Sequence, residues 1–250
     1  MIYDTEALIL SRYSYGDTSL ICNLFTAEYG RLSIIAKGAR KIKSPYNAIL
    51  RPLQFIDLHY YYKSKRNIQL LKEATLNQHF FETHNNYSKI IASYQLLDII
   101  NQICKIDNPN KIIFRLTKKI LNKINIKDSK HIMTYKIFFN LQLLNYIGYQ
   151  PMIDFCNTCN KKLVDGKFQW EIGQLVCLDC KSNDSKNIDL IIDQRNLNLI
   201  RYLSNTHIDE INTEISNSNY NLEVINKYLL YFLSFHIINL KYLKSFKLAI

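Results

Sequence analysis

Four of the six cysteines stand in two pairs whose spacing suits a metal ion. Cys156-x2-Cys159 is followed, after seventeen residues, by Cys177-x2-Cys180. A CxxC turn places both sulfurs on one side of a tight loop, and two such loops close a tetrahedron around zinc with Zn–S distances of about 2.3 Å. The pattern predicts one Zn²⁺ per chain. Because four thiolates leave no position for water or substrate, its expected role is structural and not catalytic.

Few alternatives compete for these cysteines. Two disulfides could use the same residues, but a reducing cytoplasm disfavours them. The intervening segment Lys167–Leu175 is expected to form the hairpin of a zinc ribbon, with Gly166 and Gly173 as turn points.

Cys22 and Cys104 stand alone in apolar runs and are interpreted as ordinary buried cysteines. The six histidines lie far from the module in sequence and form no ligand pair.

The second candidate site is a run of basic residues. The formal net charge is +11, and four thiolates with one Zn²⁺ would leave +9, which suits a polyanion such as nucleic acid or an acidic protein tail. No acidic residue occurs between Tyr29 and Ile56, while Lys37–Lys43 carries four positive charges in seven residues. Loops at the mouth of a small barrel are where such folds hold single strands. Two plainer explanations stay open: the codon bias of an AT-rich genome and an ordinary solvated loop.

Aromatic residues accompany another basic cluster. The run Tyr60–Tyr62 continues directly into Lys63, Lys65 and Arg66. Successive side chains on a strand point to opposite faces, so Tyr61 is expected on the side opposite its neighbours. At least one tyrosine should then face outward, where a base could stack. Core and rim packing of the tyrosines is an equally good interpretation.

A third basic patch lies on a predicted helix. At 100° per residue, the Lys and Arg residues between positions 111 and 123 fall within about 140° of one helix face, and only Ile112 lands among them. An ordinary amphipathic helix with a lysine-rich solvated side explains this at least as well. The residues expected to contact nucleic acid in the three regions are Arg31, Lys37, Arg40, Lys41, Lys43, Tyr61, Lys63, Lys65, Arg66, Lys118 and Lys119.

The elements that must position these residues begin with strands. Five short runs rich in Ile, Leu, Tyr and Phe are separated by turn signals such as Gly16-Asp17 and Ser44-Pro45. Five antiparallel strands in about 75 residues fit a small barrel of the OB type, although an SH3-like barrel fits the periodicity nearly as well. The predicted strands are Ala7–Leu10, Ser19–Phe25, Arg31–Lys37, Leu53–Tyr62 and Asn67–Ala74.

From about Asn77 the apolar period becomes helical. Asn108-Pro109 predicts a helix start with Pro in the first turn, and Gly148 predicts a helix stop. A polar linker is expected at Lys181–Asn187. The predicted helices are Asn85–Ile106, Pro109–Ile126, Ser129–Ile147, Asp193–Ser204 and Leu222–Phe246.

These elements predict an α+β chain with an N-terminal five-stranded OB-type barrel, followed by a helical domain with an inserted zinc ribbon of four cysteine ligands. The expected divisions are 1–78 for an OB-fold nucleic-acid-binding domain, 79–152 for the first part of the helical domain, 153–183 for the zinc module and 184–250 for the second helical part.

The sequence carries no motif for catalysis or export. It has no phosphate-binding Gly-rich loop, no GxSxG and no HExxH motif, so no enzyme activity is expected. The N-terminus has no basic region followed by a long apolar run, so no signal peptide is expected. The apolar stretch Tyr228–Leu240 is interrupted by polar residues and is shorter than the roughly 20 residues that cross a bilayer. We therefore expect a cytoplasmic protein without a membrane partner.

The order of these parts resembles the RecO family of bacterial recombination mediators. The family's barrel is matched by Tyr15-Gly16-Asp17 with Ser19, by the stretch Leu24–Gly30 and by the run Lys37–Arg40. The segment LQLLNYIGYQPMIDFCNTC is similar to the helix that leads into the family's zinc knuckle, and FLSFHIINLKYLKS to its last helix. Asn160 follows the first CxxC where zinc ribbons often carry Gly, which can alter the turn but not the ligands.

This resemblance implies a protein that binds single- and double-stranded DNA and anneals complementary strands. It further implies action with the RecR protein to load the RecA recombinase onto DNA coated by single-stranded DNA-binding protein, and association with the nucleoid. In the family a hydrophobic pocket flanked by basic residues takes the acidic C-terminal tail of the coating protein.

Two other classes of function stay open. A zinc-ribbon RNA-binding or transcription-associated adaptor would share the basic barrel and the zinc module, and would prefer structured RNA. A small nucleic-acid-processing enzyme would need a metal-binding carboxylate cluster, and none is evident in the sequence.

Overall fold

The computed structural model of the chain describes residues 1–78, 80, 83, 85–106, 108–180, 190–211, 215, 220–239, 243 and 245. It divides by contact into two compact units. The first is Met1–Ile126 together with Lys241–Ile250, and the second is Lys127–Leu240. Histidines 79 and 84 and the predicted linker 181–187 lie outside the described residues. The four-part division expected from the sequence stays a prediction.

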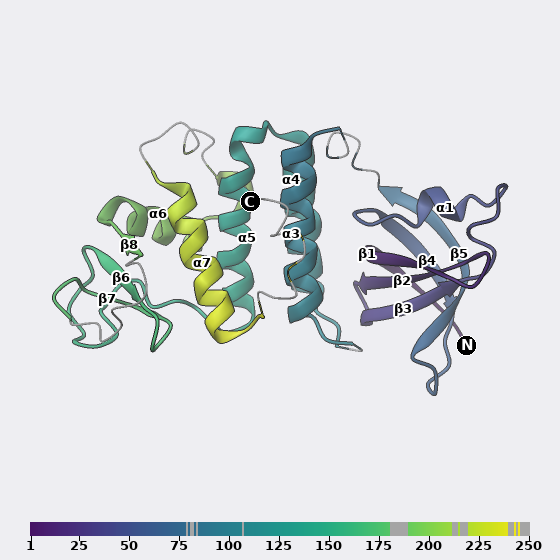
Figure 1. Cartoon of the computed structure of the whole chain (residues 1–250), viewed down its shortest axis with the longest axis horizontal. Coiled ribbons are helices and arrows are strands. Elements are labelled where there is room, and N and C mark those ends of the chain that lie inside the picture. Colours follow the sequence, from purple (N-terminus) through teal and green to yellow (C-terminus); the bar gives the residue numbers. More distant parts are fainter. Residues whose placement is uncertain are drawn as a thin grey trace. The chain divides into compact units, whose positions relative to one another are not determined.

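The first unit contains a closed five-stranded barrel with the order β1-β2-β3-β5-β4 (Figure 1). Strand β4 returns to pair with β1, and only β3 and β5 run parallel. This arrangement confirms the OB-type barrel. The strands are β1 (Ile2–Tyr15), β2 (Ser19–Thr26), β3 (Gly30–Ala36), β4 (Phe55–Tyr61) and β5 (Ile68–Gln78).

Strand β1 is much longer than the predicted Ala7–Leu10. Those four residues are all buried, whereas the rest of the strand is mostly half-buried or exposed. Its first half pairs with β4 and its second half with β2, with an irregularity between Ile9 and Ser11. An apolar run identifies only the segment of β1 that is buried on both faces. The polar residues on either side of it, which pair with β4 and β2 to close the barrel, give no such signal.

Three helices complete the described first unit. A short helix, α1 (Tyr46–Ile49), lies in the β3–β4 connection and was not predicted. Helices α3 (Tyr87–Ile103) and α4 (Lys111–Ile126) confirm the predicted pair. The predicted start of α4 at Pro109 is wrong by two residues, because the Asn110 side chain accepts the backbone N–H of Ile113 and so caps the helix.

Helix α4 packs against the barrel through aromatic side chains. The Phe114 ring lies 5.5 Å from Phe25 and 5.7 Å from Phe55, centroid to centroid.

Near the end of the chain, Ser245 donates to Asp98 of α3 from both its backbone N–H (2.8 Å) and its hydroxyl (2.6 Å). A residue close to the C-terminus is therefore part of the first unit.

The second unit consists of helices and the cysteine module. Its helices are η1 (Ser129–His131), α5 (Ile132–Tyr146), α6 (Gln194–Asn205), η2 (Ile208–Glu210) and α7 (Leu222–His236). Helix α5 is buried at twelve of its fifteen positions, as expected of a helix that is apolar nearly all round. It ends at Tyr146, just before the predicted stop at Gly148, which has a φ of +78°. Helix α7 ends before the predicted Phe246, because residues 237–239 are not helical.

The cysteine module forms a small three-stranded sheet with the order β7-β6-β8. Strands β6 (Gly166–Gln169) and β7 (Gln174–Val176) form the predicted hairpin, and β8 (Ile191–Ile192) adds a strand that was not predicted. Gly173 is a turn residue with a φ of +66°, as expected. Gly166 is not, because it lies within β6 and pairs with Ile192. No helix among the described residues is both long and apolar enough to cross a membrane.

Candidate metal centre and nucleic-acid interface

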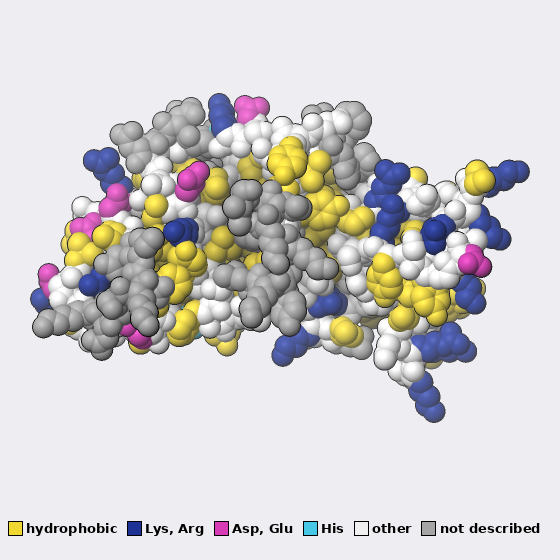
Figure 2. Space-filling model, in the orientation of Figure 1, with side chains coloured by type: hydrophobic (Ala, Val, Ile, Leu, Met, Phe, Trp, Pro, Cys, Tyr) yellow, Lys and Arg dark blue, Asp and Glu magenta, His cyan; other side chains and the backbone are white. Residues whose placement is uncertain are grey.

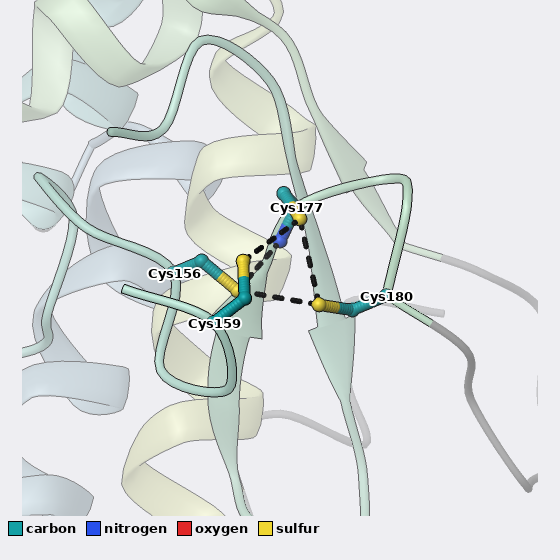
Figure 3. A group of neighbouring side chains, drawn as sticks. All are labelled: Cys156, Cys159, Cys177 and Cys180. Atoms are coloured by element: carbon teal, nitrogen blue, oxygen red, sulfur yellow. Dashed lines mark hydrogen bonds between the residues drawn. The ribbon is translucent and has the colours of Figure 1, made fainter. Parts of the chain in front are cut away.

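The four paired cysteines converge from two loops (Figure 3). The sulfur atoms of Cys156 and Cys180 are 3.7 Å apart, those of Cys159 and Cys177 are 3.6 Å apart, and those of Cys177 and Cys180 are 3.5 Å apart. A tetrahedron with metal–sulfur distances of about 2.3 Å has edges of about 3.8 Å. All six cysteines are free thiols, and no sulfur pair approaches the roughly 2.05 Å of a disulfide. The four side chains are therefore placed to hold one metal ion.

Backbone groups prepare Cys156 to act as a thiolate ligand. Its sulfur accepts the N–H groups of Thr158 (3.4 Å) and Cys177 (3.2 Å). Burial alone would raise the pKa of the Cys156 thiol, but these N–H groups and that of Cys159 outweigh it and lower the pKa to about 6. Metal ions bind the thiolate and not the thiol, so this environment suits a metal ligand.

The two cysteines outside the module are core residues. Cys22 is fully buried and Cys104 is nearly so. Burial raises the pKa of each to about 12, although Arg12 near Cys22 and Arg31 near Cys104 act in the other direction. Both therefore stay protonated at neutral pH, in agreement with their interpretation as ordinary core residues.

Local backbone geometry keeps the knuckle and the hairpin in place. Asn160 has a φ of +58°, in the left-handed region where Asn is more common than most other non-Gly residues, so the first knuckle keeps its turn. The hairpin turn contacts α7, where His236 Nε2 lies 2.9 Å from the carbonyl oxygen of Gly173. A Cβ added at Gly173 would lie 2.2 Å from the Phe235 ring, so a larger residue would require that ring to move.

The basic loop Lys37–Lys43 follows β3 and lies at the surface, as predicted. Lys37, Arg40, Lys41 and Lys43 are all exposed. The backbone N–H of Arg40 donates to the carbonyl of Thr18 (2.8 Å), and its guanidinium donates to that of Gly16 (3.1 Å). The loop is thus fixed to the β1–β2 turn. Dark-blue Lys and Arg side chains gather over the barrel on the face seen in Figure 2, where magenta acidic side chains are scarce.

Arg12 adds a charge that the sequence reasoning missed. Its Nη1 donates to the carbonyls of Asn47 (2.7 Å) and Leu50 (3.1 Å). Arg12 and Arg40 together line a hollow of about 220 Å³. Arg12 lies alone in a polar strand flank, and only the folded barrel brings it near the basic loop. No signal in the sequence could have shown that Arg12 and Arg40 lie close together.

Other candidate residues are engaged within the protein. Arg31 donates through Nη1 to the carbonyls of Asn101 and Cys104 at the end of α3, and its burial lowers its pKa. Lys118 forms an ion pair with Glu6, and its ammonium group lies 5.4 Å from the Phe55 ring centroid. Lys119, in contrast, is exposed.

The tyrosine run alternates as predicted. Tyr60 is 1% exposed and belongs to the core, whereas Tyr61 is 41% exposed on the opposite face of the strand. Tyr62 lies half-buried directly after β4. The three basic residues that follow, Lys63, Lys65 and Arg66, are exposed in the β4–β5 turn.

Family models and curated relatives that are similar to this chain all belong to one family. A model described as "Recombination protein O N terminal" matches residues 1–80, and one described as "Recombination protein O C terminal" matches residues 84–245. The DNA repair protein RecO of Salinibacter ruber is 30% identical over 153 residues, 61% of this chain and 58% of that protein. That of Thermoanaerobacter sp. is 30% identical over 185 residues, 71% of each chain. That of Alkaliphilus metalliredigens is 25% identical over 238 residues, 95% of this chain and 94% of that protein. The chain thus spans less than two thirds of the length of some of these curated relatives.

Proposed function

Since the chain belongs to the RecO family of DNA repair proteins, we propose that it is a recombination mediator that binds single- and double-stranded DNA and anneals complementary strands without catalysing a reaction. With RecR, it helps to load RecA onto DNA coated by single-stranded DNA-binding protein, whose acidic C-terminal tail it contacts. The action with RecR, RecA and single-stranded DNA-binding protein is supported by the family resemblance alone.

The observation that carries the DNA-binding proposal is the exposed basic loop on the barrel. Residues 1–78 contain eleven Lys and Arg against six Asp and Glu, and no acid occurs between Tyr29 and Ile56. Annealing is opposed by the mutual repulsion of two phosphate backbones. A surface that neutralises phosphates on both strands lowers this barrier without ATP or bond cleavage.

The metal in the proposed function is Zn²⁺, held by Cys156, Cys159, Cys177 and Cys180. Four thiolates at tetrahedral spacing are a ligand set that suits zinc. When bound, the ion supplies folding free energy to a module whose sheet has only short strands. In this proposal the zinc ion does not contact DNA and catalyses no reaction.

An annealing assay tests the proposal. The purified protein, without ATP, should accelerate pairing of complementary oligonucleotides, and it should also pair strands precoated with single-stranded DNA-binding protein. An arm with structured RNA separates the adaptor alternative, which predicts tighter binding to the RNA. Labelled DNA incubated with Mg²⁺ should stay intact. Breakage that survives rigorous purification and disappears with a point mutation in this chain would overturn the non-enzymatic proposal.

A further inference from the structure

Three tyrosine rings from separate parts of the first unit form one stacked set. Tyr3 lies at the start of β1, Tyr29 in the β2–β3 turn and Tyr62 directly after β4. The Tyr3 ring is nearly parallel to that of Tyr29 (centroids 5.2 Å apart, planes at 5°) and to that of Tyr62 (4.8 Å, 22°). Tyr60 meets Tyr3 and Tyr29 edge-on, at 5.9 and 6.1 Å. Buried Tyr60 thus supports the set from the core side.

These rings line a hollow of about 500 Å³ in the barrel. We call it the tyrosine hollow; it is lined by Tyr3, Tyr29, Tyr62, Leu32, Arg66 and Asn67, among other residues. Tyr3, Tyr29 and Tyr62 pack against the barrel core yet are only half-buried. A second hollow of about 420 Å³ shares Tyr3 and Tyr62 and adds Lys63 and Lys65. The Tyr3–Tyr62 pair therefore borders two adjacent spaces.

The charge of the β4–β5 turn, on one side of the tyrosine hollow, favours an anionic ligand. Lys63, Lys65 and Arg66 are exposed in the β4–β5 turn, and none of them forms an ion pair with any described residue. The turn is braced by Gln69, which donates to the carbonyls of Lys63 (3.1 Å) and Arg66 (2.7 Å). Glu28 also lines the hollow, but its carboxylate lies 3.9 Å from the ammonium of Lys111.

We propose that the tyrosine hollow binds unpaired bases of single-stranded DNA by stacking, with the β4–β5 turn holding the adjacent phosphates. The inference rests on the proposed function and specifies how the barrel grips a single strand. A hollow of this size lies within the range of ligand pockets, and base–aromatic stacking tolerates any sequence because every base has a π-face. The occupant is an unpaired base because a base inside a duplex has no free face to offer.

Placement in the hollow distinguishes Tyr62 from Tyr61, the tyrosine expected from the sequence. Tyr61 is exposed on the other face of the strand and lines neither of the two hollows. Tyr62 shares a stacked geometry with Tyr3, which holds its ring in a fixed orientation. An aromatic side chain that is already oriented loses less conformational entropy when a base stacks on it.

Fluorescence anisotropy with a labelled oligo-dT strand tests the inference. Tyr62→Leu should weaken single-strand binding by about tenfold and leave duplex binding unchanged. Its salt dependence should stay the same, because no phosphate contact is removed. Tyr62→Phe should bind like the original protein, since the ring is kept. Tyr87→Leu, a change at a tyrosine that is 68% exposed on α3, is the matched control and should have no effect.

A strand of abasic sugars supplies the complementary measurement on the unmodified protein. It should bind about tenfold more weakly than oligo-dT, and Tyr62→Leu should not weaken it further. Equal affinity for the two strands would overturn the inference while leaving the proposed function intact. Failure to bind any single strand would instead overturn the proposed function.

Photocrosslinking covers the case in which Tyr62→Leu does not fold. A strand carrying 5-iodouracil should crosslink in the unmodified protein to Tyr3, Tyr29 or Tyr62, as located by mass spectrometry. Crosslinks confined to Tyr61 or to residues outside the barrel would refute the tyrosine hollow as the base site.

Discussion

Hydrogen bonds to one sulfur connect the two halves of the metal module. Thr158 donates to Cys156 from within the first CxxC pair, and Cys177 donates to it from the second. The Cys156 thiol has a pKa of about 6, so its metal-binding form predominates at neutral pH. Cys159, Cys177 and Cys180 would supply the other three ligands of a tetrahedral site. Without the metal ion, the two CxxC loops would no longer be held together by a shared ligand site.

We expect Cys177→Ser to lose the metal and to be less stable. The zinc content, measured by elemental analysis, should fall from about one per chain to near zero. A loss of about 3 kcal/mol or more would lower the Tm by roughly 6–12 °C in a chain of this size. Cys104→Ala, outside the module, should keep its zinc. The site would be refuted if freshly purified, reduced protein contained no zinc.

Single residues also mark where sequence reasoning was sufficient and where it was not. The gathering of the four paired cysteines agrees with their spacing, because a CxxC turn is a local structure. The alternation of Tyr60 and Tyr61 follows from strand geometry. The contact of Tyr62 with Tyr3 and Tyr29 could not be predicted, since it depends on barrel closure that brings residues 3, 29 and 62 together.

At the scale of elements, the basic loop and helix α4 present their charges differently. On α4, Lys111 lies near Glu28 and Lys118 pairs with Glu6. The loop contains no acid, and its Arg40 is fixed to the β1–β2 turn by hydrogen bonds to carbonyls. Within the described part of the chain, Arg40 forms no ion pair. The amphipathic pattern of the helix could be predicted, but not its ion pairs, because Glu6 lies more than a hundred residues away in sequence.

We therefore predict that the loop contributes more to DNA affinity than the helix. Each phosphate contact contributes about −0.7 to the slope of log K against log salt for single strands. Arg40→Ala with Lys41→Ala should flatten this slope by roughly one unit or more and weaken binding to every sequence alike. Lys118→Ala with Lys119→Ala, which removes the same charge, should have a smaller effect. Salt titrations by fluorescence anisotropy compare the two; a larger loss from the helix pair would contradict the prediction.

Element boundaries show the limits of sequence patterns in the same way. The five strands and the main helices follow from their apolar runs and from the spacing of their apolar residues. The flanks of β1, the short α1 and the two-residue β8 were missed, since none has a long apolar run. Helix α4 begins after the Asn110 cap, so the start predicted from Pro109 is two residues too early.

On the scale of the whole molecule, a buried lysine links stability to pH. Lys136 of α5 is 9% exposed, and burial lowers its pKa to about 8 from an ordinary 10.5. Between these values the unfolded chain holds a proton that the folded chain has released, so stability rises as pH increases from about 8 to 10.5. Below pH 8 the folded protein carries a buried charge at a cost in stability.

Removing that charge should stabilise the protein. Lys136→Met should raise the free energy of unfolding by about 2–3 kcal/mol at pH 7. The difference from the original protein should shrink as the pH approaches 10, as followed by urea denaturation at a series of pH values. Lys130→Met, a change at an exposed lysine, is the control and should show no such trend. A difference that does not vary with pH would contradict this account.

The hydrogen bonds from Ser245 to Asp98 have a consequence for protein synthesis. The first unit contains the N-terminal barrel, but one of its contacts uses a residue translated after the whole second unit. The barrel strands all precede residue 79 and can pair while the ribosome is still extending the chain. Helix α3, in contrast, cannot form its hydrogen bonds with Ser245 until that residue has left the exit tunnel. These two hydrogen bonds of the first unit can therefore form only after the whole second unit has been synthesised, whatever the order in which the other elements fold.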